Sequence, residues 1–178
     1  MQQQRRTAAI QNYYENWMMK EGVPIHEAMA GLDDVTELSR KPWSRTGGLG
    51  AFIHMLGPKQ AERGIYVGEV PGGKSLNPER HLYQEVIIVL KGLGSTEIWQ
   101  EGMSKHSFEW GEGSVFAPPL NCWHRFINGG RERALLAADN WLADWVKAGA
   151  FIRKRILYYG IAFAVSLPCV AVTSAFAF

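Results

Sequence analysis

The chain is poor in cysteine, and its charge is nearly balanced. Its 178 residues include two cysteines, Cys122 and Cys169, which form no CxxC pair. This excludes the common cysteine-based zinc and redox motifs and is typical of a reduced, cytosolic protein. The N-terminus has no apolar signal segment. The net charge is +2, and the longest basic run is 153–155. We therefore expect a cytoplasmic protein that binds no nucleic acid.

Three regions with different patterns follow one another, at 1–45, 46–140 and 141–178. The chain is 47% hydrophobic and contains seven tryptophans, which indicates a folded core rather than disorder. In the first region, apolar side chains recur at helical spacing over residues 7–20, and Gly22 and Pro24 end the pattern. These features predict an N-terminal helical arm and lead-in.

The middle region consists of short apolar runs separated by glycine and proline. Many short strands at close spacing are typical of an all-β barrel or sandwich. The turns between the runs contain glycine pairs or a proline with two glycines. We expect strands at 50–56, 64–70, 85–92, 95–102, 114–119, 124–129 and 134–139.

The last region combines an amphipathic helical pattern at 141–155 with an uncharged stretch at 156–178. That stretch has 23 residues, which is long enough to cross a hydrocarbon layer of about 30 Å. It directly follows a basic run, as the cytoplasmic flank of a membrane anchor would. A membrane anchor is one interpretation, although Pro168 interrupts the stretch. A C-terminus altered by a frameshift and an apolar element packed on the barrel are two others. The sequence leaves all three open.

Two imidazoles and one carboxylate stand out as candidate metal ligands. His81 and Glu85 lie just before the apolar run at 86–90, and His124 begins a later strand. A carboxylate at the start of a buried strand is costly unless it is paired or bound to a cation. Two His and one carboxylate form a ligand set for a divalent first-row metal with open positions.

Strand geometry sets a condition on this metal site. A straight strand carries residues 81 and 85 about 13 Å apart, which is too far for two ligands of one ion. The chain must therefore bend between His81 and Glu85. On the later strand, alternation places His124, Phe126 and Asn128 on one face.

At this point the sequence resembles the cupin superfamily. The segment GGKSLNPERHLYQEVIIVLKG is similar to the first cupin motif and places Glu79, His81, Glu85 and Gly92 at its key positions. The segment GSVFAPPLNCWHRFIN is similar to the second motif. The key positions of this second motif hold Gly113, Pro119, Asn121, His124 and Asn128. The resemblance covers residues 46–140 and includes the hairpin between the motifs.

This sequence departs from the cupin motifs at two positions. Glu79 stands where the family usually has its first His, so either it adds a second carboxylate ligand or it leaves only three ligands. Asn121 replaces a Gly at a tight turn. Asn tolerates left-handed backbone angles better than most residues, so we expect the turn to survive.

The resemblance implies a jelly-roll β-barrel that holds a divalent metal, with Fe(II) or Mn(II) favoured and Ni(II) or Zn(II) as alternatives. It also implies a small-molecule enzyme. A dioxygenase is our leading hypothesis, with an isomerase or decarboxylase as alternatives, and a non-catalytic binding or sensing module is the second hypothesis. We expect a homodimer. Tyr83 is the catalytic candidate, and the expected substrate pocket consists of Tyr83, Phe126, Trp99 and Asn128.

Overall fold

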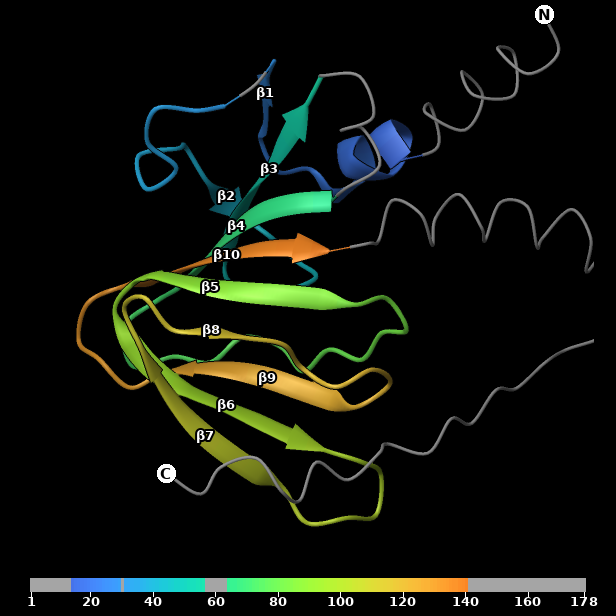
Figure 1. Cartoon of the computed structure of the whole chain (residues 1–178), viewed down its shortest axis with the longest axis vertical. Helices are drawn as coiled ribbons and strands as arrows, with labels where there is room; N and C mark the ends of the chain where they lie inside the picture. The colour runs from blue at the N-terminus through green and yellow to red at the C-terminus, as the bar shows by residue number, and fades with distance from the viewer. Residues whose placement is uncertain (1–13, 30, 57–63, 141–178) are drawn as a thin grey trace, which may run out of the picture.

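The computed structural model describes residues 14–29, 31–56 and 64–140, and these fold into two facing β-sheets (Figure 1). The described residues form strands that are numbered in the order of the chain. They are β1 (Ile25–Ala28), β2 (Lys41–Pro42), β3 (Leu49–Met55), β4 (Gly64–Val70), β5 (Glu85–Lys91), β6 (Leu93–Trp99), β7 (His106–Gly111), β8 (Val115–Phe116), β9 (Trp123–Asn128) and β10 (Ala134–Asn140).

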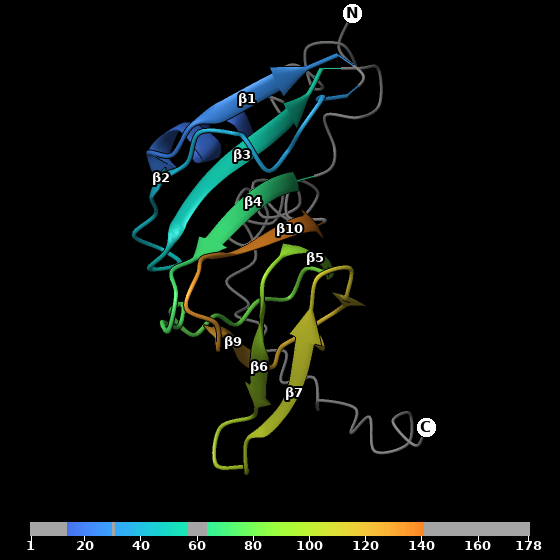
Figure 2. The same cartoon turned by 90° about the vertical axis from the view of Figure 1, so that its left-hand side faces the viewer.

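The larger sheet has the order β1-β3-β4-β10-β5-β8, and β2 pairs with β3. The smaller sheet has the order β7-β6-β9. β10 lies between β4 and β5 and pairs antiparallel with both, so the last strand is central. Figure 2 shows the same sheets after a quarter turn, with β6 and β7 below the larger sheet. This architecture confirms the predicted all-β class.

Alternation along the strands decides which side chains enter the space between the sheets. In β9, the alternate residues His124, Phe126 and Asn128 are buried, while their neighbours are partly exposed. In β5, Glu85, Ile87 and Val89 are buried in the same way. His124 therefore belongs to the inward-facing residues of the smaller sheet, and Glu85 belongs to those of the larger sheet.

A short helix covers one end of the larger sheet. Residues 14–21 are helical, and Tyr14 and Met18, one turn apart, are 3% and 1% exposed. Trp17 contacts the ring of Phe52 on β3 with a centroid distance of 5.4 Å, and Trp43 contacts the same ring at 5.1 Å. The described part of the N-terminal region thus packs its apolar stripe on the core. Residues 1–13 lie outside the described residues.

The predicted turns coincide with left-handed backbone conformations. Gly92 has a φ of 92° between β5 and β6, and Gly113 has a φ of 83° before β8. Asn121 has a φ of 60°, which confirms that Asn can occupy this turn. Its backbone N–H donates to the carbonyl of His81 at 2.9 Å, so the turn contacts the segment that carries a candidate ligand.

Several details differ from the sequence expectations. The larger sheet begins at Ile25, because β1 pairs in parallel with β3 ahead of the expected start at residue 46. The structure contains no free cysteine among the described residues, which differs from the reduced state expected from the low cysteine content. In the described part of the chain, no helix has the length and apolar character needed to cross a bilayer. The predicted anchor at 156–178, like the helix at 141–155, lies outside the described residues.

Gly94 provides a test of the tight packing between β6 and its neighbours. A Cβ there would collide with the carbonyl oxygen of Ile127 and the ring of Trp110. We predict that Gly94→Ala lowers the free energy of unfolding by about 3 kcal/mol, measured by urea denaturation with tryptophan fluorescence. Gly111→Ala is the control, since a Cβ there meets nothing within 4 Å. Equal stability of the two variants would contradict this packing.

Candidate metal centre

The two segments with candidate ligands are joined edge to edge by backbone hydrogen bonds. Glu79 N–H donates to the carbonyl of His124 at 2.8 Å, and His124 N–H donates to the carbonyl of Glu79 at 2.9 Å. The segment before β5 therefore extends the smaller sheet along β9. This pairing brings His81, two residues beyond Glu79, next to His124.

The chain bends between His81 and Glu85, as a shared metal site requires. Residues 82 and 83 adopt a bend, and β5 begins at Glu85. As a result, Nε2 of His81 lies 3.5 Å from Oε2 of Glu85 rather than the length of a straight strand away. The geometric condition derived from the sequence is met.

His81, Glu85 and His124 form one compact group, in which Glu85 and His124 are buried and His81 is partly buried. Each contributes one potential ligand atom, and these atoms all lie within 4.8 Å of one another. The rings of His81 and His124 are nearly perpendicular, at 84°, with centroids 5.0 Å apart. Glu85 and His124 are both 1% exposed. The site is thus held mainly within the protein interior.

Backbone carbonyls orient both imidazoles. The Nδ1 atom of His81 lies 2.8 Å from the carbonyl oxygen of Tyr83, and that of His124 lies 3.3 Å from the carbonyl oxygen of Cys122. A carbonyl only accepts, so each Nδ1 must carry the hydrogen. The Nε2 atoms are then free of hydrogen in the neutral rings and available to an ion.

Two residues that the sequence analysis did not identify orient Glu85. Tyr66 on β4 donates its hydroxyl hydrogen to Oε1 of Glu85 at 2.9 Å, and Asn140 on β10 donates an amide hydrogen to the same oxygen at 3.4 Å. These bonds leave Oε2 facing the imidazoles. Strand alternation could have indicated that Tyr66 and Asn140 lie on the inward side of their strands. Nothing in the sequence indicated which strands would flank β5.

The three potential ligand atoms have no other hydrogen-bonding role. Nε2 of His81, Oε2 of Glu85 and Nε2 of His124 are all buried without a hydrogen-bond partner. A buried polar atom left unpaired costs about 1–3 kcal/mol, and three converging on one point require a shared explanation. A divalent cation would satisfy all three, so the residues present fit a bound metal.

The protonation states of the group also suit cation binding. Burial raises the pKa of Glu85, but the neighbouring imidazoles of His81 and His124 and the hydrogen bond from Tyr66 outweigh burial and hold that pKa below its usual value. Burial lowers the pKa of His124 to about 4, and the charge of His81 acts in the same direction. At neutral pH, Glu85 is therefore a carboxylate and His124 a neutral imidazole, which are the forms that bind metals.

Glu79 lies beside the group but does not belong to it, because its carboxylate is not among the atoms that converge. Its Oε2 lies 3.9 Å from Nη1 of Arg45, and its Oε1 is buried without a partner. Burial raises the pKa of this carboxyl, against the opposing charge of Arg45.

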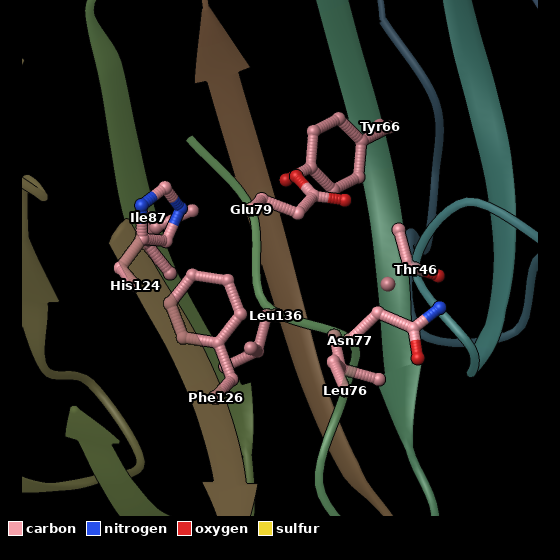
Figure 3. A pocket seen from close by; sticks show the side chains of 10 residues that line it. Thr46, Tyr66, Leu76, Asn77, Glu79, Ile87, His124, Phe126 and Leu136 are labelled. Carbon is pink, nitrogen blue, oxygen red and sulfur yellow. The ribbon is translucent and has the colours of Figure 1, made fainter. Parts of the chain in front are cut away.

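A small pocket adjoins the metal group. Figure 3 shows the Glu79 carboxylate between Tyr66 and His124 at this pocket. The cavity has a volume of about 10 Å³, which gives room for about one water molecule. Its lining consists of Thr46, Tyr66, Gly68, Leu76, Asn77, Glu79, Ile87, His124, Phe126 and Leu136.

Phe126, Tyr83 and Asn128, which were expected in the substrate pocket, differ in where they lie. Phe126 lines the pocket. Tyr83 stacks on His81 with parallel rings 3.8 Å apart, and its hydroxyl accepts a long hydrogen bond from Arg45 at 3.4 Å. Asn128 uses its side chain to bind the backbone of Val70, Gly130 and Glu132, which is a structural role.

The structure places Trp99 away from the pocket. Its register partner is Trp123, whereas the neighbouring Ile98 pairs with His124. Because successive residues of a strand point to opposite faces, Trp99 lies on the outer face of the smaller sheet. It stacks with Trp123 there at 6.3 Å.

Solved structures show which fold this arrangement belongs to. The cupin domain of Cnp3 from Schizosaccharomyces pombe superposes with a TM-score of 0.50 at 15% identity, over 63% of this chain and 68% of that one. An oxalate oxidase superposes with a TM-score of 0.51 at 17% identity, over 62% and 58%. The plu4264 protein of Photorhabdus luminescens gives 0.50 at 18% identity, over 72% and 98%.

These comparisons show that the chain has the cupin fold, as the sequence motifs predicted. No family model matches the chain. No curated protein matches it either. The alignment spans less than two thirds of the oxalate oxidase chain, and identities below 20% carry the fold but not an activity. The fold and the buried group together define a cupin-type barrel whose His81, Glu85 and His124 could hold a metal ion.

We predict that His124→Ala removes most of the bound metal while the barrel remains folded. The variant loses one of three ligands, so metal content measured by elemental analysis should fall at least about tenfold, with an unchanged far-ultraviolet circular dichroism spectrum. His106→Ala, at an exposed position on β7, is the matched control and should keep its metal. Unchanged metal content in His124→Ala would show that the ligand assignment is wrong.

The metal-free protein should lose stability on mild acidification. The unfolded chain protonates His124 near pH 6.5, whereas the folded chain does so near pH 4. Between these values the unfolded state binds more protons, so the free energy of unfolding falls as pH falls, by about 3 kcal/mol in total from this residue. Urea denaturation between pH 7 and 4.5 measures this slope. His124→Asn should flatten it, and parallel curves for the two proteins would contradict the assignment.

Proposed function

We propose that this protein is a metal-dependent enzyme of the dioxygenase type that acts on a small molecule. The observation that supports this most strongly is the convergence of three unpartnered buried ligand atoms, from two His and one Glu, beside a small pocket. Three protein ligands leave coordination positions open, which is what a catalytic metal site needs and a purely structural one does not.

The donor set favours Fe(II) or Mn(II), with Ni(II) or Zn(II) as alternatives. Imidazole suits several first-row ions, and a carboxylate shifts the preference toward harder ones. Such an ion would supply Lewis acidity and a redox centre for dioxygen chemistry. Tyr66 and the backbone orient the ligands, and Ile87, Phe126 and Leu136 form an apolar part of the pocket lining.

The structural comparisons are compatible with this proposal, because an oxalate oxidase is among the proteins with this fold. The carboxylate of Glu85, held through one oxygen by Tyr66, keeps its other oxygen directed at the imidazoles. This preorganisation stabilises one ligand geometry before metal or substrate arrives.

A second candidate function is a non-catalytic module that binds or senses a small molecule. Two observations favour it. Glu79 occupies the place of the first motif's His yet stands outside the ligand group, and the cavity has room for about one water molecule. The Cnp3 cupin domain shares the fold, so the fold alone does not select between the two functions.

Metal analysis of the purified full chain, followed by dioxygen uptake, separates the two. Catechol-like and β-diketone-like compounds form the first substrate panel, because they present paired oxygens to a metal. The enzyme proposal predicts stoichiometric metal and dioxygen consumption with at least one compound. Tight metal without consumption across a broad panel would favour the binding module, and an absence of metal would refute both.

We predict that Glu79→Ala weakens metal binding less than Glu85→Ala does. Glu85 contributes one of the converging atoms, whereas Glu79 does not, so the loss of affinity should be at least about tenfold larger for Glu85→Ala. Metal titration by isothermal calorimetry measures both. Equal losses would mean that Glu79 is a fourth ligand.

A further inference from the structure

The polar groups that line the pocket have already used their donor hydrogens. The Tyr66 hydroxyl donates to Glu85, and the Thr46 hydroxyl donates to the carbonyl of Trp43 at 3.4 Å. The side-chain amide of Asn77 donates to the carbonyls of Ser44 and Arg45 at 3.3 and 3.0 Å. These three side chains therefore have no donor hydrogen to offer a ligand.

The acceptor side of the pocket is different. Oε1 of Glu79 is buried without a partner, while Oε2 lies near Arg45. Figure 3 shows this carboxylate between Tyr66 and His124, which is one of the proposed metal ligands. The side chain as a whole is 16% exposed, but Oε1 itself is buried, so bulk water does not replace the missing partner. A buried acceptor of this kind is expected to have a partner in the functional state.

The backbone fixes Glu79 in this position. Its N–H and C=O both pair with His124, so the residue's main chain is tied to one of the proposed metal ligands. The guanidinium of Arg45 stacks on Trp43 with its centre 4.7 Å from the ring, and Arg45 is not part of the pocket lining. The Arg45 cation therefore lies near Oε2 of Glu79, and Oε1 remains the carboxylate oxygen without a partner.

From this arrangement we infer that Glu79 selects substrates that place one small N–H or O–H donor, of about the size of a water molecule, in this pocket next to the group that meets the metal. The donor hydrogen-bonds to Oε1 of Glu79. A ligand that has only acceptors at this position, such as a dicarboxylate, would leave Oε1 unpaired and add a like charge beside it. This inference rests on the proposed metal site, and it assigns Glu79 a role in specificity rather than in metal binding.

Two probes of similar shape test this role. Acetohydroxamate and N-methylacetohydroxamate bind metals through the same oxygen pair, but only the first has an N–H hydrogen. Their dissociation constants are measured on the cobalt-loaded full chain at pH 8, from the visible absorption of Co(II). The added methyl group affects every variant, so the informative quantity is the change in the ratio of the two constants.

We expect Glu79→Met to keep its cobalt and to lose the wild-type preference for acetohydroxamate by about tenfold, the value of a hydrogen bond to a charged group. Glu101→Met is the matched control, since the Glu101 side chain is 88% exposed, and it should keep the wild-type ratio. An unchanged ratio in Glu79→Met, or loss of cobalt from it, would overturn this inference alone. Failure of the wild-type chain to bind cobalt would overturn the metal site and the inference together.

Discussion

The site depends on one short piece of backbone pairing. Glu79 and His124 exchange two hydrogen bonds, and this fixes the segment before β5 along the edge of β9. The chain can then bend at residues 82 and 83 and enter β5 at Glu85. Without that pairing, His81 would not be held at His124. With it, potential ligand atoms from distant parts of the sequence lie within 4.8 Å of one another.

The sheets around this point explain why an acidic residue can be buried there. Glu85 stands at the start of a strand whose next inward side chains are Ile87 and Val89. A lone carboxylate in that setting would be unstable. Tyr66 and Asn140 satisfy one oxygen, and the imidazoles approach the other. The remaining unpaired atoms are the ones a cation would bind, so a bound cation would also stabilise the fold.

Much of this could be predicted from the sequence, because it depends on local patterns. Strand alternation and the spacing of the two cupin motifs predicted the barrel and identified His81, Glu85 and His124. The need for a bend followed from strand length alone. Asn121 could be assigned to a left-handed turn from its own chemistry.

The rest depends on which strands lie side by side, and a single sequence carries little information about that. Tyr66 and Asn140 reach Glu85 from β4 and β10, which flank the site only after the sheet has formed. Trp99 was expected in the pocket, but the register with β9 turns Ile98 inward and Trp99 outward. The parallel pairing of β1 with β3 also had no sequence signal. The homodimer stays a prediction.

The most direct test of the central claim is anomalous X-ray diffraction from crystals of the full chain grown with manganese. We expect one strong anomalous peak at bonding distance from Nε2 of His81, Oε2 of Glu85 and Nε2 of His124. A peak elsewhere, or no peak in crystals whose fluorescence shows manganese, would contradict it.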